Sequence, residues 1–163
     1  MDQPFEANDG SGPGLLAQAR ALLGGQRDLV ANAANLSALL FYALEQVNWV
    51  GFYFLKDGQL VVGPFQGRPA CVTIPLGRGV CGTAAATRRV QRVADVHDFP
   101  GHIACDVESR SEIVVPLLAD GTLLGVLDLD SPVAKRFTRQ DEELLVEIAE
   151  CFVQSVDWRG RVA

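Results

Sequence analysis

The chain has 163 residues, 48% of them hydrophobic and 21% charged, which fits one globular domain. Its formal net charge of −6 argues against a nucleic-acid or anionic-membrane surface, because both need basic patches. No apolar run reaches the length of a membrane span, and the N-terminus lacks the basic and apolar regions of a signal peptide. We therefore expect a cytoplasmic protein that has neither nucleic acid nor a membrane as a partner.

The hydrophobic pattern changes period several times along the chain. Residues 1–14 are rich in Gly, Asp and Pro and are expected to form a disordered tail, which leaves 15–163 as the domain. The predicted elements are, in chain order, helices over 15–23 and 28–46, a hairpin of strands 49–55 and 59–62, a strand over 71–74, a short helix over 80–87, a strand over 90–93, a polar loop over 95–110, a hairpin of strands 112–118 and 123–129, and a C-terminal helix that follows the capping box Thr138–Asp141.

This order of elements predicts the fold class. Consecutive hairpins imply a largely antiparallel sheet, because strands joined by short turns pair antiparallel. The long helices at both ends of the chain must then bury their apolar sides on one face of that sheet. We expect an α+β fold, a single domain with a mostly antiparallel central sheet flanked by N- and C-terminal helices.

The four cysteines are the first candidates for chemistry. In a reducing cytosol a cysteine is a buried filler, a metal ligand or a reactive thiol, and the spacings here match no zinc framework. Cys81 begins a helix, where N–H groups and the helix dipole favour a thiolate, and Cys71 begins a strand. Cys105 lies in the polar loop, where a thiol can reach a partner. Cys151 sits among apolar residues of the C-terminal helix and is interpreted as packing.

Three acids are predicted to share one face of the last hairpin. Asp128 and Asp130 alternate along a strand, about 6.7 Å apart, and Glu112 opens the partner strand. Acids are depleted in strands, and like-charge repulsion among three of them would raise at least one pKa. The alternative is a solvated strand edge with a turn aspartate before Ser131, which explains Asp130 well and Asp128 poorly.

A glycine-rich bend from Gly77 to Gly82 opens the short helix and can present backbone N–H groups to an anion. The bend matches neither a P-loop nor a dinucleotide fingerprint, so phosphate binding is a weak prediction and a carboxylate suits the same place. Trp49 and Tyr53 fall on one face of a strand, and by themselves they are typical of core aromatics.

Six stretches of the sequence form a recognisable set. They are NWVGFY at 48–53, GPFQG at 63–67, CVTIPLGRGVCGT at 71–83, GHIACD at 101–106, SEIVVP at 111–116 and GVLDLDS at 125–131. Together they resemble the free methionine-(R)-sulfoxide reductases, a family built on the GAF domain. The resemblance runs from about residue 30 to residue 155. It is specific because three cysteines, three acids and an aromatic block occur in the same order.

The resemblance implies a GAF-like domain that reduces free methionine (R)-sulfoxide with its thiols. By this resemblance Cys105 attacks the substrate, Cys71 resolves the sulfenic acid as an intramolecular disulfide, and Cys81 is accessory and can relay that disulfide. The resemblance also implies thioredoxin as the reductant, and homodimers are common in the family. No metal and no cofactor are expected.

The substrate's chemistry agrees with the residues. A sulfoxide oxygen needs a proton from an acid with a raised pKa, a carboxylate can hold the substrate's ammonium group, and the N–H groups of the glycine-rich bend can hold its carboxylate. The resemblance implies that the acids line the pocket and that the tryptophan packs on the substrate methyl. The residues expected to bind the substrate are Trp49, Tyr53, Gly79, Val80, Cys81, Glu112, Asp128 and Asp130.

Two other functions remain open. A non-catalytic GAF sensor that binds a small molecule would have the same fold, because fold alone does not determine function. A thiol redox sensor would use the cysteines without a small-molecule substrate. The first alternative leaves the three cysteines outside the core pattern unexplained. Turnover of free methionine sulfoxide distinguishes all three functions.

Overall fold

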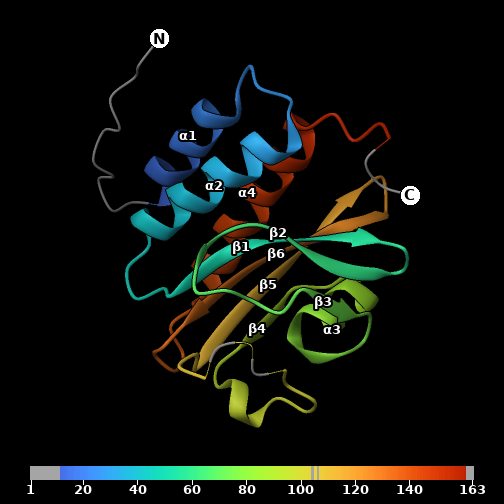
Figure 1. Cartoon of the computed structure of the whole chain (residues 1–163). Helices are drawn as coiled ribbons and strands as arrows, with labels where there is room; N and C mark the ends of the chain where they lie inside the picture. The colour runs from blue at the N-terminus through green and yellow to red at the C-terminus, as the bar shows by residue number, and fades with distance from the viewer. Residues whose placement is uncertain (1–11, 104, 106, 161–163) are drawn as a thin grey trace.

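The computed structural model describes residues 12–103, 105 and 107–160, and Figure 1 shows the arrangement of the elements. The order of helices and strands is the predicted one, with a short 3₁₀ helix added in the loop. The elements are α1 (Gly12–Leu23), α2 (Leu29–Ala43), β1 (Trp49–Lys56), β2 (Gln59–Gly67), β3 (Thr73–Pro75), α3 (Gly79–Thr87), β4 (Gln91–Val93), η1 (Val96–Asp98), β5 (Ser111–Ala119), β6 (Thr122–Ser131) and α4 (Arg139–Ser155).

One antiparallel sheet carries all six strands, in the order β3-β2-β1-β6-β5-β4. The two predicted hairpins, β1–β2 and β5–β6, are present and lie side by side because β1 pairs with β6 at the centre. The predicted α+β class is therefore confirmed, as are the antiparallel sheet and the helices at both ends of the chain.

Helices α1, α2 and α4 lie together on one face of the sheet (Figure 1). Their starts follow the predicted caps: the Asp28 side chain accepts a hydrogen bond from the Ala31 N–H, and Thr138 and Asp141 form the capping box. Their apolar sides and the inward side chains of the strands form the main core, whose largest fully buried members include Leu15, Leu36, Leu40, Phe52, Leu127, Leu129, Ile148 and Phe152.

Helix α3 and the loop after β4 cover the opposite face of the sheet (Figure 1). A second apolar cluster fills this layer, with Trp49, Tyr53, Val80 and Val126 among its buried members. Because both faces are covered, the central strands are apolar almost throughout, as the near-continuous burial of β5 and β6 shows. A buried acid on this face therefore has no structural reason to be there, which marks the layer as the place of the functional site.

Several boundaries differ from the predictions. Helix α1 begins at Gly12, so the last three residues of the expected tail are helical, while residues 1–11 lie outside the described part of the chain. Helix α2 ends at Ala43 rather than 46, because the next residue already has extended dihedral angles. Strand β3 begins at Thr73, two residues later than expected, which leaves Cys71 in the connection before it.

Strand β2 continues to Gly67, well beyond the predicted end at residue 62. The pair Gly63-Pro64 gives a turn signal, but Pro64 lies beyond the part of β2 that pairs with β3, where a proline costs no ladder hydrogen bond. A shift in register between Gly51 and Tyr53 of β1 is followed by further pairing, which ends where Gly67 pairs with Trp49. The extension brings the following residues beside the Trp49 indole.

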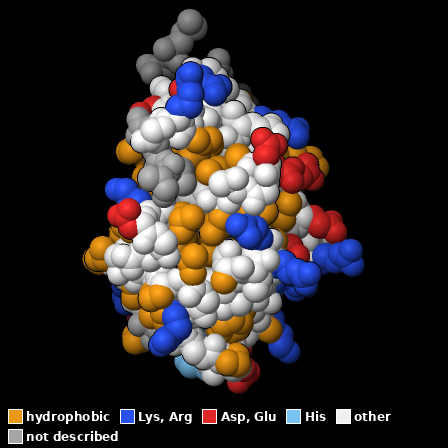
Figure 2. Space-filling view, turned by 90° about the vertical axis from the view of Figure 1, so that its right-hand side faces the viewer, with side chains coloured by type: hydrophobic (Ala, Val, Ile, Leu, Met, Phe, Trp, Pro, Cys, Tyr) orange, Lys and Arg blue, Asp and Glu red, His pale blue; other side chains and the backbone are white. Residues whose placement is uncertain are grey.

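The surface mixes charge types. On the face drawn in Figure 2, basic and acidic side chains are interspersed with apolar ones. The large hydrophobic residues that are exposed include Val72 and Val107, at 66% and 82%, which flank Cys71 and Cys105. No helix in the described part of the chain has the length and apolar character needed to span a membrane.

Candidate active site

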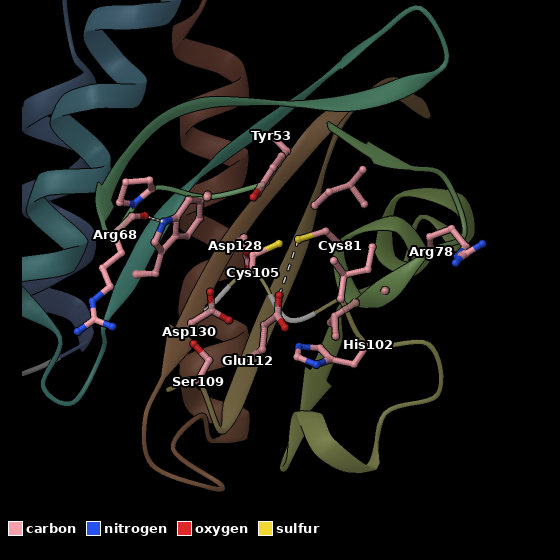
Figure 3. Close-up of a pocket in the computed structure, with 17 residues that line it drawn as sticks. Tyr53, Arg68, Arg78, Cys81, His102, Cys105, Ser109, Glu112, Asp128 and Asp130 are labelled. Atoms are coloured by element: carbon pink, nitrogen blue, oxygen red, sulfur yellow. Dashed lines mark hydrogen bonds between the residues drawn. The ribbon is translucent and has the colours of Figure 1, made fainter. Parts of the chain in front are cut away.

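A pocket lies between the sheet and the layer formed by α3 and the 95–110 loop (Figure 3). Its volume is about 40 Å³, room for about three water molecules. The sequence-predicted residues that line it are Trp49, Tyr53, Gly79, Val80, Cys81, Cys105, Glu112, Asp128 and Asp130. The remaining predicted residue, Cys71, joins the pocket through a disulfide bond to Cys105.

Strand register brings the three acids together. The β5–β6 ladder places Glu112 opposite Asp130, and Asp128 follows two residues away on the same face of β6. Glu112 and Asp128 are buried, at 6% and 5% exposure. The Oδ1 atom of Asp128 is buried without a hydrogen-bond partner among the described residues. Burial rules out a solvated strand edge for these two acids.

The two buried carboxyl groups both have raised pKa values, but different neighbours act on them. Burial, and then the charges of Asp128 and Asp130, raise the pKa of Glu112 well above its ordinary value. Burial also raises the pKa of Asp128 to about 6, against hydrogen bonds from Glu112 and Cys81 that lower it. Burial therefore raises the pKa of Glu112 more than charge repulsion does, whereas the sequence predicted only the repulsion. Burial and the neighbouring acids thus favour the protonated form of Glu112, while hydrogen bonds from Glu112 and Cys81 favour the ionised form of Asp128.

The expectation that Cys81 is a thiolate is wrong. Its thiol is buried beside the acids, and its pKa rises well above the ordinary value, first through burial and then through the charges of Asp128 and Glu112. These effects outweigh the helix dipole, whose contribution is small by comparison. The Cys81 Sγ instead donates to Glu112 Oε1 at 3.8 Å (Figure 3). Within the described chain, Cys81, Glu112 and Asp128 also form the set of donor atoms that is close enough to hold a metal ion.

An aromatic wall closes one side of the pocket. The Trp49 ring stacks on Tyr53 and Phe65, with centroids 5.8 and 5.2 Å away, and its Nε1 donates to the carbonyl of Arg68 at 3.1 Å. Gly51 lies between Trp49 and Tyr53 on β1, and a Cβ there would come within 2.7 Å of the Trp49 ring. A side chain at position 51 would therefore displace the Trp49 indole, and glycine leaves room for it.

The N-terminus of α3 faces the pocket. Its first three residues, Gly79, Val80 and Cys81, have N–H groups for which the helix itself provides no acceptor, and the N-cap Arg78 makes no side-chain cap. Gly79 has a φ of +64°, and an added Cβ would meet Ile103 of the covering loop at 3.2 Å. Glycine thus allows both the bend and the close approach of the loop.

The 95–110 loop is fastened at both its base and its tip. At the base, the Arg110 guanidinium binds the Asp95 carboxylate at 2.8 Å and holds the pKa of that carboxyl below its ordinary value. At the tip, Cys105 is bonded to Cys71 across a Cα–Cα distance of 5.6 Å, ordinary for a disulfide. Cys151 is half-buried against the helix-side core, so its interpretation as packing is confirmed.

Four polar residues of the pocket lining were missed from sequence: Arg68, Arg78, His102 and Ser109. Burial, followed by the charge of His97, lowers the pKa of His102. Arg78 lies inside the glycine-rich bend, so its place in the sequence could have indicated that it lines the pocket. Arg68 and Ser109 carry no such signal, because they reach the pocket only through the extension of β2 and the end of the loop.

The sequence of the chain is similar to those of known proteins across the whole region that forms the pocket. Residues 14–155 match the model of the GAF domain. The free methionine-R-sulfoxide reductase of Escherichia coli is 56% identical over 128 residues, which cover 78% of this chain and 78% of the relative. The chain belongs to the free methionine-R-sulfoxide reductase family of GAF domains. The resemblance read from the sequence motifs is thereby confirmed.

Solved structures of similar proteins extend the comparison. The free methionine-R-sulfoxide reductase of Neisseria meningitidis, in complex with its substrate, matches with a TM-score of 0.87 at 41% identity over 95% of this chain and 92% of that one. A protein of Burkholderia vietnamiensis described as a GAF sensor matches with a TM-score of 0.86 at 58% identity over 89% and 92% of the two chains. Proteins similar to this chain are thus named both as reductases and as GAF sensors.

Proposed function

We propose that this member of the free methionine-R-sulfoxide reductase family is itself a reductase that converts free methionine (R)-sulfoxide to methionine. The observation that carries the proposal is the Cys71–Cys105 disulfide at a pocket whose floor holds Glu112, an acid whose pKa is raised well above its ordinary value. A sensor needs a pocket but neither a redox pair nor a proton donor. The named activity of the relatives from E. coli and N. meningitidis supports the same conclusion.

In the proposed reductive step, the Cys105 thiolate attacks the substrate sulfur while Glu112 protonates the sulfoxide oxygen. The protonated oxygen then passes from the substrate sulfur to the Cys105 sulfur, as the sulfur–oxygen bond of the substrate and the sulfur–sulfur bond formed in the attack both break. Methionine leaves as the two-electron-reduced product, and Cys105 is left as a sulfenic acid. Glu112 suits the donor role because burial and the charges of the neighbouring acids raise its pKa well above the ordinary value. Ionised Asp128 lies beside it and can accept a proton or hold a cationic group.

In the proposed resolving step, the Cys71 thiolate attacks the sulfenic sulfur, hydroxide leaves as water, and the disulfide seen here forms. Thioredoxin then reduces the disulfide by thiol exchange. Val72 and Val107 support a protein reductant, because these exposed aliphatic side chains flank the two sulfurs and give a partner apolar surface to contact. A relay by Cys81 is not required, since its neutral thiol is a weak nucleophile.

Recognition of the free amino acid follows from opposite charges at the two ends of the substrate. The acids on β5 and β6 bind its ammonium group, and the N–H groups of Gly79, Val80 and Cys81 bind its carboxylate. Trp49 packs against the methyl group. The substrate binds the reduced form, because the Cys105 thiolate that attacks it is absent from the disulfide form.

Two broader proposals accompany this mechanism. The protein works in the reducing cytoplasm, where a dithiol reductant is supplied. It forms a homodimer, for which α2 offers the exposed apolar side chains of Val30 and Tyr42. Light scattering on the purified protein gives the mass of the particle and tests the dimer directly.

The decisive experiment couples the reaction to thioredoxin, thioredoxin reductase and NADPH. We expect NADPH oxidation with free methionine (R)-sulfoxide and none above background with the S epimer. For the N-acetylated, C-amidated sulfoxide, kcat/KM should be lower by about 5- to 150-fold or more. This derivative lacks the ammonium and carboxylate groups, and their loss leaves buried polar groups of the protein unpaired. Saturable binding of the free sulfoxide without any turnover would instead identify a sensor.

A further inference from the structure

A buried thiol and two buried carboxyl groups meet on the pocket floor. Donor atoms of Cys81, Glu112 and Asp128 all lie within 4.8 Å of one another. The three residues are only 5%, 6% and 5% exposed. One of the donor groups has capacity to spare, because Asp128 Oδ1 is buried with no hydrogen-bond partner among the described residues. Such an oxygen, held beside a thiol, is a donor atom available to a bound ion.

We infer that Cys81, Glu112 and Asp128 form a binding site for one thiophilic divalent cation of the zinc or cadmium class. Three protein ligands with a fourth position open to the pocket is the arrangement of an accessible zinc site. The Cys81 Sγ–Glu112 Oε1 distance of 3.8 Å is close to the roughly 3.6 Å between a thiolate and a carboxylate oxygen on tetrahedral zinc.

The donor set also selects the kind of ion. Magnesium and calcium need six or more oxygen ligands, whereas a thiolate with carboxylates favours softer ions. A search for ligand spacing in the sequence does not detect this site, because Cys81 and Glu112 are 31 residues apart and come together only through packing of α3 on the sheet.

Binding of the ion involves no change of oxidation state. The Cys81 thiol and the Glu112 carboxyl group each release a proton to the buffer, and Asp128 binds in its ionised form. The ion then occupies the floor of the pocket and removes the proton that the proposed function assigns to Glu112. It therefore acts as an inhibitor that competes with the sulfoxide, and this consequence, unlike the binding itself, rests on the proposed function.

The disulfide form of the protein gives a clean test of binding. In this form Cys71 and Cys105 are bonded to each other, so Cys81 and Cys151 are the free thiols. Cadmium chloride is added to the oxidised chain without thiols or chelators, and the ultraviolet sulfur-to-cadmium charge-transfer band is recorded with equilibrium dialysis. We expect one ion per chain, a band that zinc abolishes, and no displacement by magnesium.

Matched variants identify the ligands. The band should be lost in Cys81→Ser and kept in the control Cys151→Ser. In Glu112→Gln, where the thiol remains, the affinity should fall at least about tenfold. If Cys81→Ser does not give the circular dichroism spectrum of the wild type, the Glu112→Gln and Asp128→Asn affinities decide. A band that persists in Cys81→Ser, a band that disappears in Cys151→Ser, or wild-type affinity in both acid variants overturns the proposal.

A second measurement separates this proposal from the proposed function. Methionine formed in one turnover of the reduced protein is measured with and without zinc, and the ratio of the two rates is compared between wild type and Cys81→Ser. We expect zinc to slow the wild type and to affect the variant much less. Inhibition that is equal in both would place the zinc on Cys105 instead. One-to-one cadmium binding without turnover would leave the metal site standing and refute the reductase.

Discussion

Glu112 and Asp128 are two neighbouring carboxyl groups whose surroundings favour different protonation states. Both are buried, yet Asp128 accepts hydrogen bonds from Glu112 and Cys81 that stabilise its ionised form. Glu112 is close to two other acids, which favour its protonated form. The pair therefore places a proton donor next to an anion, and this difference can be tested one residue at a time.

Glu112→Gln keeps the size of the side chain and removes the proton that can be transferred. We expect the rate of the reductive step to fall by about 10²- to 10⁴-fold, with a smaller change in substrate affinity. Single-turnover kinetics with pre-reduced protein measure this step without the thioredoxin reaction. A variant that raises KM alone would show that Glu112 binds the ammonium group and that another group supplies the proton.

Asp128 gives the folding stability a specific pH dependence. Its pKa is raised from 3.8 to about 6 in the folded state, so its contribution is greatest below pH 4 and is lost as the pH rises to about 6. This loss is about 2–3 kcal/mol of unfolding free energy. Asp128→Asn does not titrate, so its stability relative to the wild type should increase over the same interval. Urea unfolding from pH 4 to pH 7 measures it, and parallel curves for the two proteins would contradict the assignment.

Cys105 and Cys151 are predicted to differ completely in function. Cys105→Ser should abolish turnover, because serine cannot take the sulfoxide oxygen and form the disulfide. Cys151→Ser should keep nearly full activity, since that side chain packs against the helix-side core away from the pocket. The coupled assay measures both variants. Residual turnover in Cys105→Ser would refute the proposed nucleophile.

At the level of elements, the N-terminus of α3 depends on a glycine that faces the covering loop. Gly79→Ala introduces a Cβ at a φ of +64° and 3.2 Å from Ile103. We expect a loss of about 1–2 kcal/mol from the backbone strain, together with a higher KM because the N–H groups shift. Gly58→Ala is the matched control, because Gly58 has a φ of +78° with open space around it in the β1–β2 turn. Its unfolding free energy should fall similarly while KM stays unchanged, and equal KM values for the two variants would contradict the role of α3.

The elements also show how far the sequence can be interpreted. The two hairpins and the alternation within them were sufficient to predict that Glu112, Asp128 and Asp130 share a face. The end of β2 was not predictable, because Gly63-Pro64 is typical of a turn. The strand continues through this pair only because that part of β2 is not paired with β3. The protonation of Cys81 was not predictable either, since local sequence reports the helix start and only packing reports its burial against acids.

At the scale of the whole molecule, the sheet separates stability from chemistry. One face carries the large core with α1, α2 and α4, and the other carries α3, the loop and the pocket (Figure 1). The sequence predicted that the long terminal helices cover one face of the sheet, and the family resemblance supplied the expected activity. The shape of the pocket in the disulfide form needed the structure, because it depends on where the loop lies relative to the acids.

The groups proposed to recognise the substrate lie on the sheet and on α3, whereas the two disulfide-bonded cysteines lie on connecting segments. The chain can therefore be converted into an optical biosensor for methionine sulfoxide. Replacing Cys71 and Cys105 with serine removes the chemistry and the tether, and Trp158→Phe removes the second tryptophan, which packs on Phe152 away from the pocket. The remaining Trp49 lies in the pocket wall, so its fluorescence should change in a saturable way with the free sulfoxide and stay constant with the blocked derivative. Such a reporter would bind the sulfoxide in the same pocket and release it unchanged.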